Sequence, residues 1–160
     1  MIATPVAEEV TYRPATLLDV AAMAQLRPEP WVNAPDWDYR LAAYLSGEHN
    51  PRHALPERVM IVAEQDDEVV GFIAGHLTRR HDCDGELQWI NVSAAQRGQG
   101  IATGMLRELA DWFVSNNVHR VCVDAKPRNP EARSFYTRHG AEPLKSNWLV
   151  WSDIERAQEY

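Results

Sequence analysis

The residues best suited to chemistry form a glycine-containing stretch from Arg97 to Gly100. It lies between an apolar run that ends at Val92 and a helical pattern of apolar residues that starts at Ile101. The first turn of a helix leaves backbone N–H groups unpaired, and the helix dipole adds partial positive charge there. Gly98 and Gly100 can adopt positive φ and let a phosphate approach the backbone, while Arg97 adds charge. The stretch predicts an anion site, with a tight strand-to-helix turn as the alternative.

Two common phosphate-binding motifs do not fit this stretch. The dinucleotide fingerprint G-x-G-x-x-G needs a third glycine where this chain has Thr103. No Gly-Lys-Ser or Gly-Lys-Thr follows, as the loop of a nucleoside triphosphatase would require. Neither dinucleotide binding nor nucleotide hydrolysis is indicated.

A mixed order of strands and helices has to position this loop. Thr16 is the expected N-cap of the first helix, with Asp19 at the capping-box position, and Asp66 and Asp67 are the expected turn of an antiparallel hairpin. Segment 27–57 has the character of an insertion over a surface. The patterns predict strands at 10–15, 58–65, 69–80, 86–92, 118–125 and twice within 141–151, and helices at 16–27, 35–45, 100–115 and 130–139. This order favours a mixed α/β fold with one central sheet and helices on its faces.

Length, composition and charge narrow the class of protein. A chain of 160 residues that is 45% apolar fits one domain spanning 1–160. Its 16 Lys and Arg against 23 Asp and Glu give a net charge of −7, which disfavours nucleic acid as a partner. The first residues lack the features of a signal peptide, and no stretch is long and apolar enough to span a membrane. We therefore expect a soluble, cytoplasmic protein.

The cysteines and histidines suggest no metal site. Cys122 belongs to an apolar run and is expected in the core, whereas Cys83 is expected to be an exposed thiol. His49 and His53 are four residues apart, but the proline between them disfavours a shared helix face. The sequence HDCD at 81–84 is interpreted as a hairpin tip rather than a zinc site.

Two motifs resemble those of the GNAT superfamily of N-acetyltransferases. RGQGIA resembles the family's R/Q-x-x-G-x-G/A signature, and NPEARSFYTRHG resembles its N-x-x-A-x-x-F-Y-x-x-x-G motif. The resemblance extends over about four-fifths of the chain, with 27–57 as the variable region. It implies a central, mostly antiparallel sheet of about seven strands, splayed between strands 4 and 5 and flanked by about four helices. The matching positions are Arg97, Gly100 and Ala102 in the first motif, and Asn129, Ala132, Phe135, Tyr136 and Gly140 in the second.

The resemblance also implies acetyl-CoA as cosubstrate, without a metal. The pyrophosphate would lie on the glycine-containing loop, and the pantetheine arm would pair with 90–92 like an added strand. The Val92 N–H would polarise the thioester carbonyl. Asn129 would contact the CoA arm, or serve as a helix N-cap before Pro130, or do both. The residues expected to hold the cofactor are Ile90, Asn91, Val92, Arg97, Gly98, Gln99, Gly100, Ile101, Ala102, Thr103 and Asn129.

Two side chains are candidates for proton transfer. By the resemblance, the phenol of Tyr136 would protonate or hydrogen-bond the CoA sulfur, and the alternative is a core aromatic beside Phe135. Glu86 stands on the strand where some family members carry the glutamate that deprotonates the amine. Its alternative is a solvated carboxylate, with water-relayed groups acting as the base.

The acceptor site is less defined. Trp31, Asp36 and Trp37 fall in the region that lines it in the family, and aromatic faces with carboxylates suit a cation. The same residues could instead pack a helix on the sheet and leave the acids in water. Trp148 and Trp151 could pack at the end of the sheet or support a homodimer.

Together these features predict an acetyl-CoA-dependent N-acetyltransferase in which a primary amine attacks the thioester directly within a ternary complex. Small-molecule and protein amines both remain open as acceptors, and the acidic balance leans towards a small cation. An acceptor such as charged tRNA would need a basic surface. The alternative is a non-catalytic acyl-CoA-binding regulatory module, against which the presence of both Tyr136 and Glu86 argues.

Overall fold

Seven strands form one sheet in the order β1-β2-β3-β4-β5-β7-β6 in the computed structural model, which describes residues 9–27, 36–127 and 129–159. All neighbouring strands pair antiparallel except β4 and β5, which run parallel. The expected mostly antiparallel sheet is confirmed. Its strands are β1 (Thr11–Pro14), β2 (Ala54–Gln65), β3 (Glu68–Thr78), β4 (Gly85–Val92), β5 (Val121–Asp124), β6 (Glu142–Lys145) and β7 (Trp148–Trp151).

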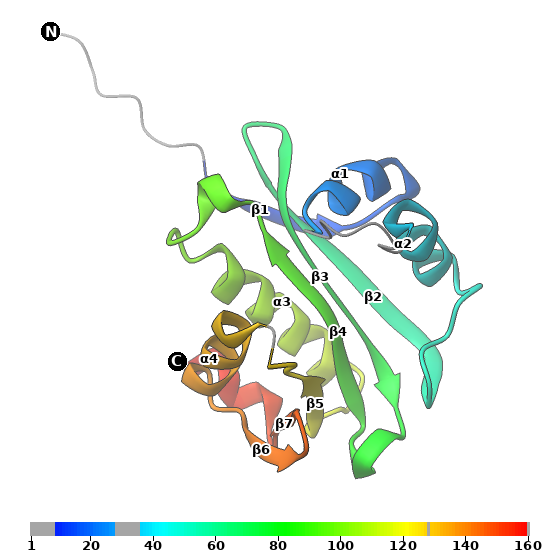
Figure 1. The fold of residues 1–160 in the computed structure, drawn as a ribbon, viewed down its shortest axis with the longest axis vertical. Coiled ribbons are helices and arrows are strands. Elements are labelled where there is room, and N and C mark those ends of the chain that lie inside the picture. Colours follow the sequence, from blue (N-terminus) through cyan, green and yellow to red (C-terminus); the bar gives the residue numbers. More distant parts are fainter. Residues whose placement is uncertain (1–8, 28–35, 128, 160) are drawn as a thin grey trace, which may run out of the picture.

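Helices cover both faces of this sheet (Figure 1). Because successive side chains of a strand point to opposite faces, β3 buries Phe72 towards α1 and α2 and Ile73 towards α3. One face carries α1 (Val20–Gln25) and α2 (Trp37–Ser46), and the other carries α3 (Ile101–Ser115), α4 (Pro130–Arg138) and the 3₁₀ segment η4 (Ile154–Glu159). Within the described residues, no helix is both long and apolar enough to cross a bilayer.

β4 and β5 separate soon after they begin to pair. Their register runs from Gly85 opposite Val121 to Leu87 opposite Val123, and then it ends. The pairing of β4 with β3 also shifts by one residue at Gln88, which marks a bulge at the same point. Among the described residues, the edge of β4 that faces β5 is therefore open from Gln88 to Val92. The expected splay between strands 4 and 5 is confirmed, and it leaves an unpaired strand edge in the middle of a sheet.

The turn between β2 and β3 has the predicted residues and a conformation that suits them. Asp66 and Asp67 both have positive φ, 54° and 61°. Two successive positive φ values match the twist of a tight hairpin, and aspartate tolerates them better than most residues. The predicted antiparallel hairpin is confirmed.

The predicted capping box is also present, at the 3₁₀ turn Leu17–Asp19 that leads into α1. The Thr16 hydroxyl accepts a bond from the Leu18 N–H (3.3 Å), and the Asp19 carboxylate accepts one from the Thr16 N–H (2.8 Å). Asp19 further accepts two bonds from the Arg13 guanidinium, at 2.8 and 2.9 Å. One carboxylate thus closes the turn and ties it to β1.

This arrangement predicts a pH-dependent contribution to stability. Hydrogen bonds from Arg13 hold the pKa of Asp19 below its ordinary value of 3.8. We expect Asp19→Asn to lower the free energy of unfolding by about 1–2 kcal/mol at neutral pH. Because folding lowers the pKa, the carboxylate's contribution is complete above pH 3.8 and is lost as the pH falls through the folded-state value. Denaturant unfolding of both proteins along a descending pH series measures this, and a difference that persists undiminished in acid would contradict it.

Cys83 is buried, with 3% of its surface exposed, and lies against Cys122 and Val150. The expectation of an exposed thiol is therefore wrong. The turn before β4 folds back, and the N–H of the next residue, Asp84, donates to the Arg120 carbonyl at 2.9 Å, which turns Cys83 inward. The expected core position of Cys122 is confirmed, since its side chain is fully buried.

The two C-terminal tryptophans both pack on the sheet. Trp151 is buried, with its ring edge-on to Tyr136 and its indole N–H donating to the His139 carbonyl at 2.9 Å. Trp148 is half-buried, 4.9 Å from the His81 ring and with the Arg80 guanidinium 4.8 Å from its ring centre. Packing within the chain accounts for both side chains, and homodimer formation stays a prediction.

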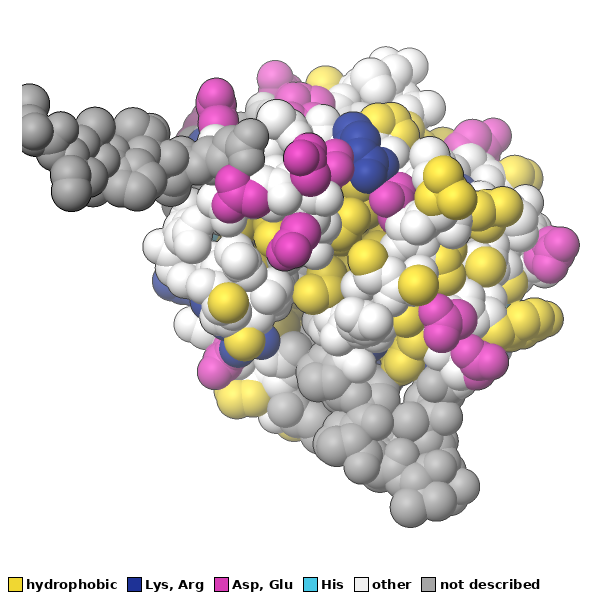
Figure 2. All heavy atoms as spheres, turned by 90° about the horizontal axis from the view of Figure 1, so that it is seen from above, with side chains coloured by type: hydrophobic (Ala, Val, Ile, Leu, Met, Phe, Trp, Pro, Cys, Tyr) yellow, Lys and Arg dark blue, Asp and Glu magenta, His cyan; other side chains and the backbone are white. Residues whose placement is uncertain are grey.

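The surface charge reflects the acidic composition where it is seen in Figure 2. This view looks onto the end of the molecule at the top of Figure 1, and shows acidic side chains spread among apolar and polar ones with few basic ones between them.

Candidate active site

A cleft of about 390 Å³ opens between the end of β4, the loop that follows it and α4. It is lined by all the residues predicted to hold the cofactor except Gln99. The side-chain Oε1 of Gln99 instead accepts a hydrogen bond from the side-chain amide of Gln65 at the end of β2, at 3.3 Å. The lining residues are Ile90, Asn91, Val92, Gln96, Arg97, Gly98, Gly100, Ile101, Ala102, Thr103, Asn129, Glu131, Ala132, Phe135 and Arg138.

The glycine-containing loop has the geometry of an anion site. Gly98 and Gly100 have φ of 84° and 80°, a region that residues with a Cβ rarely adopt. Gly100 is the N-cap of α3, and no side chain caps the helix there. The N–H groups of the first turn, which belong to residues 101–103, therefore remain for a ligand, together with the positive end of the helix dipole.

The open edge of β4 forms the second wall. Ser93 N–H donates to the Val70 carbonyl of β3 at 2.7 Å. Because neighbouring N–H groups of a strand point to opposite edges, the Val92 N–H points to the open edge. This edge offers backbone donors and acceptors to an extended ligand, as an added strand would use them.

α4 forms the third wall, and its position is set by specific contacts. The Asn129 side chain accepts a bond from the Ala132 N–H at 3.0 Å, so its predicted capping role before Pro130 is confirmed. At the other end, the His139 ring bonds the Thr103 hydroxyl at 3.1 Å and so ties α4 to the first turn of α3. Across the mouth of the cleft, Arg97 lies 3.7 Å from the Glu131 carboxylate.

Five lining residues were not predicted to hold a cofactor. They are Gln96, Glu131, Ala132, Phe135 and Arg138. Ala132 and Phe135 belong to the second motif, and helical spacing places 131, 135 and 138 on one face of α4. A search along that face would have found them, and Arg138 would have been identified as a second cation beside Arg97.

Tyr136 does not line the cleft but lies buried behind it. Its ring packs edge-on against Trp151 and beside Phe135, with centres 5.8 and 5.9 Å apart. Its hydroxyl makes no hydrogen bond to any described residue. Burial raises the pKa of Tyr136, against a smaller downward effect from the positive charge of Arg27. The phenol therefore keeps its proton at neutral pH and is available as a donor.

Glu86 is buried as well, with 5% of its surface exposed, so the interpretation as a solvated carboxylate is wrong. It sits opposite Cys122, one residue before β4 and β5 part. Its carboxylate accepts a bond from the Arg80 guanidinium at 3.0 Å and lies 3.7 Å from His76 Nε2. The other ring nitrogen of His76 bonds the Tyr44 hydroxyl at 2.9 Å. The pattern of apolar runs gave no sign of this buried polar chain.

The structure describes two of the three residues predicted near the acceptor. Trp31 lies outside the described residues. Asp36 is exposed and serves as N-cap of α2, accepting a bond from the Tyr39 N–H at 3.2 Å. Trp37 is buried, 5.8 Å from Trp89 and edge-on to it. These two residues follow the packing alternative, in which α2 is packed on the sheet and its acid faces water.

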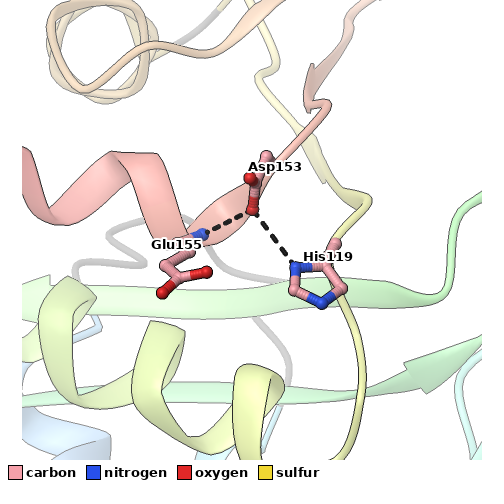
Figure 3. Close-up of side chains that lie close together, drawn as sticks. All are labelled: His119, Asp153 and Glu155. Atoms are coloured by element: carbon pink, nitrogen blue, oxygen red, sulfur yellow. Dashed lines mark hydrogen bonds and ion pairs between the residues drawn. The ribbon is translucent and has the colours of Figure 1, made fainter.

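One group of His and acidic side chains could share an ion among the described residues: His119, Asp153 and Glu155 (Figure 3). Asp153 Oδ1 already accepts a bond from the Glu155 N–H at 3.2 Å and lies 3.2 Å from His119 Nδ1. These contacts close the turn into η4, and they explain why the three side chains meet at the surface. The histidines and acids of HDCD do not form such a group.

Residues 20–141 match the acetyltransferase (GNAT) family. This match covers most of the chain and includes both motifs, so the chain belongs to that family. The resemblance drawn from the motifs is confirmed.

Individual relatives agree with this assignment. L-2,4-diaminobutyric acid acetyltransferase of Halalkalibacterium halodurans is 29% identical over 83 residues, which are 51% of this chain and 43% of that protein. The chain thus spans less than half the length of this relative. The fold matches PaiA N-acetyltransferase of Thermoplasma acidophilum in complex with coenzyme A, with a TM-score of 0.68 and 14% identity over 89% of this chain and 96% of that one. Diaminobutyrate acetyltransferase EctA of Paenibacillus lautus, in complex with its substrate and coenzyme A, matches with a TM-score of 0.64 and 16% identity over 92% and 96%.

Proposed function

We propose that this chain is an acetyl-CoA-dependent N-acetyltransferase that acts on a small-molecule amine. One observation carries the proposal: a single cleft joins the open edge of β4, the uncapped start of α3 and the face of α4. The shape and donors of that cleft suit a long ligand with a phosphate at one end and an amide chain at the other. The name of the relative makes L-2,4-diaminobutyrate the first acceptor to test.

The three walls of the cleft suit three parts of acetyl-CoA. The pyrophosphate fits the first turn of α3, with Arg97 and Arg138 adding positive charge. The pantetheine arm fits the open edge at 90–92, where its amides can pair with the backbone. The thioester then lies on the open edge of β4, in the gap between β4 and β5.

The reaction needs no covalent enzyme intermediate. The neutral amine attacks the thioester carbonyl, the Val92 N–H stabilises the developing oxyanion, and the carbon–sulfur bond breaks as the new amide bond forms. Tyr136 donates its proton to the leaving thiolate, and Glu86 takes a proton from the amine. Proton exchange with water restores both groups, so the products are the acetylated amine and CoA.

Two measurements on one sample test the proposal. Calorimetric titration with acetyl-CoA measures binding, and an assay for free CoA with a panel of amines, led by L-2,4-diaminobutyrate, measures transfer. Binding together with amine-dependent CoA release is the expected result. Absence of acetyl-CoA binding would refute the assignment of the cleft.

A non-catalytic acyl-CoA-binding module is the second candidate, and one observation favours it. Tyr136 and Glu86 are both buried, and neither lines the cleft. Tight binding of acetyl-CoA without CoA release from any amine of the panel would support the module instead of the enzyme.

Substitution of Glu86 by Gln tests the base. We expect kcat to fall about 100-fold with little change in acetyl-CoA affinity, because the amide keeps the shape of the side chain but cannot accept the proton. Initial rates over a pH series and acetyl-CoA titrations measure both quantities.

The variant Arg80→Gln serves as the control for Glu86. It breaks the same ion pair but leaves the carboxylate in place, so its kcat should fall far less. Equal losses of kcat in both variants would mean that the ion pair, rather than the base, matters.

A further inference from the structure

Two arginine side chains contact the ring of Trp37, on the face of the sheet that α1 and α2 cover. The guanidinium carbon of Arg27 lies 4.2 Å from its ring centre, and that of Arg40 lies 4.6 Å away. Two guanidiniums on one ring stand out in a chain with net charge −7, on which scattered acidic side chains outnumber basic ones in the view of Figure 2. An aromatic face already in contact with the protein's own cations is poorly placed to receive a cationic ligand.

Two side chains on this face, those of Arg40 and Trp37, have donors without an acceptor among the described residues. Among the described residues, Arg40 is half-buried and has no ion pair with an acid. The indole N–H of Trp37 is buried and has no hydrogen-bond partner in the part of the chain that the structure describes, and only 8% of the surface of this residue is exposed. Buried donors normally find a partner, so an unpaired one is evidence for a missing acceptor. A cation and an N–H donor side by side suit an anion.

The group is connected to the open edge of β4. Arg27 Nη1 donates to the Asn91 side chain at 2.8 Å, and Asn91 lines the cleft. Tyr136, whose pKa is raised by burial against a smaller downward effect of the Arg27 charge, packs on the opposite face of the sheet. Arg27 therefore lies close to the gap between β4 and β5, where the thioester is placed by the proposed function.

We propose that Arg27, Arg40 and the indole N–H of Trp37 bind a carboxylate of the acceptor, so that the acceptor is an amino acid rather than a simple polyamine. This inference rests on the proposed function, because it places the acceptor beside the thioester. Guanidiniums match carboxylates with paired, charge-assisted hydrogen bonds, which an amine without a carboxylate cannot form. The carboxylate anchors the molecule while its amine reaches the thioester.

Matched pairs of amines test this inference by binding. The protein saturated with CoA is titrated calorimetrically with L-2,4-diaminobutyrate and with 1,3-diaminopropane, which is the same diamine without the carboxylate. Lysine with cadaverine, and ornithine with putrescine, are two further pairs. We expect the carboxylated member of at least one pair to bind about tenfold or more tightly than its partner.

Substitutions test which side chains cause the preference for the carboxylated amine. Arg40→Gln should reduce the preference within that pair by about tenfold, and Trp37→Phe, which keeps an aromatic ring but removes the N–H, should reduce it less. Arg107→Gln on α3 makes the same change of charge on the other face of the sheet and should leave the preference unchanged. If Arg40 only holds Trp37 in place, its loss would weaken both members of a pair equally, which would overturn the inference.

The outcomes separate this inference from the proposed function. Carboxylate-dependent binding without CoA release from acetyl-CoA would leave the subsite in place and refute the enzyme. Acetylation of decarboxylated amines as efficiently as their partners would keep the enzyme and overturn the subsite. Absence of binding by every carboxylated amine would also overturn the subsite.

Discussion

Replacing Tyr136 by Phe should lower kcat about 100-fold while the Kd for acetyl-CoA stays unchanged. The phenol keeps its proton at neutral pH because burial raises its pKa, so it is suited to protonating a departing thiolate. Phe preserves the edge-on contact with Trp151, and the lost hydroxyl makes no hydrogen bond to any described residue. The effect should therefore appear in the chemical step and not in folding.

Steady-state rates, acetyl-CoA titrations and thermal unfolding of the variant measure these three quantities. Tyr12→Phe is the matched control, because Tyr12 is also a partly buried phenol with a pKa raised by desolvation. It lies on β1, three strands from β4, and its loss should leave kcat unaffected. Full turnover by Tyr136→Phe would show that Tyr136 is only a core aromatic.

Replacing Gly100 by Val should weaken acetyl-CoA binding by at least about tenfold. A β-branched residue at φ of 80° is strained by about 2 kcal/mol, and relief of that strain would turn the first N–H groups of α3 away from the cleft. No protein atom lies within 4 Å of a Cβ built at this position, so the side chain would stand in open space at the cleft. Both effects act against a phosphate at this site.

Gly47→Val separates loss of binding from loss of stability. Gly47 ends α2 with φ of 85°, and a Cβ there also meets nothing within 4 Å. The two variants should therefore lose similar stability in thermal unfolding, but only Gly100→Val should lose affinity in calorimetry. Equal affinity of the two variants for acetyl-CoA would contradict the assignment of the loop as the phosphate site.

Features that depend on neighbouring residues were predictable from the sequence. The Asp66–Asp67 turn, the Thr16 cap, the positive φ of Gly100 and the Asn129 cap each depend on contacts within a few residues. The alternation of apolar residues likewise predicted the strands, with errors of a few residues at their ends. The glycine-containing loop and the start of α4 could be predicted for the same reason, whereas the open edge of β4 was implied only by the resemblance to the family.

Other features depend on residues that are far apart in the chain. The Arg80 and His76 partners of Glu86, the inward turn of Cys83 against Cys122, and the guanidinium of Arg27 on Trp37 all join separate segments. Sequence patterns contain no information on such pairs, because a titratable or polar residue looks the same whether it meets water or a partner. For this reason the solvated alternative for Glu86 and the expectation of an exposed Cys83 both proved wrong.

The amino-acid sequence by itself determined the order of elements and the loop that suits a phosphate, because turn residues, caps and apolar spacing act over short distances, and its two motifs indicated the family by resemblance. Only the tertiary structure decided where β4 parts from β5, which carboxylates are buried and which charge surrounds Trp37. Those outcomes depend on how distant segments pack together. The chemistry proposed for this chain depends on both, since local motifs build the phosphate loop and the start of α4, while packing opens the edge of β4 and sets the charges around the reacting groups.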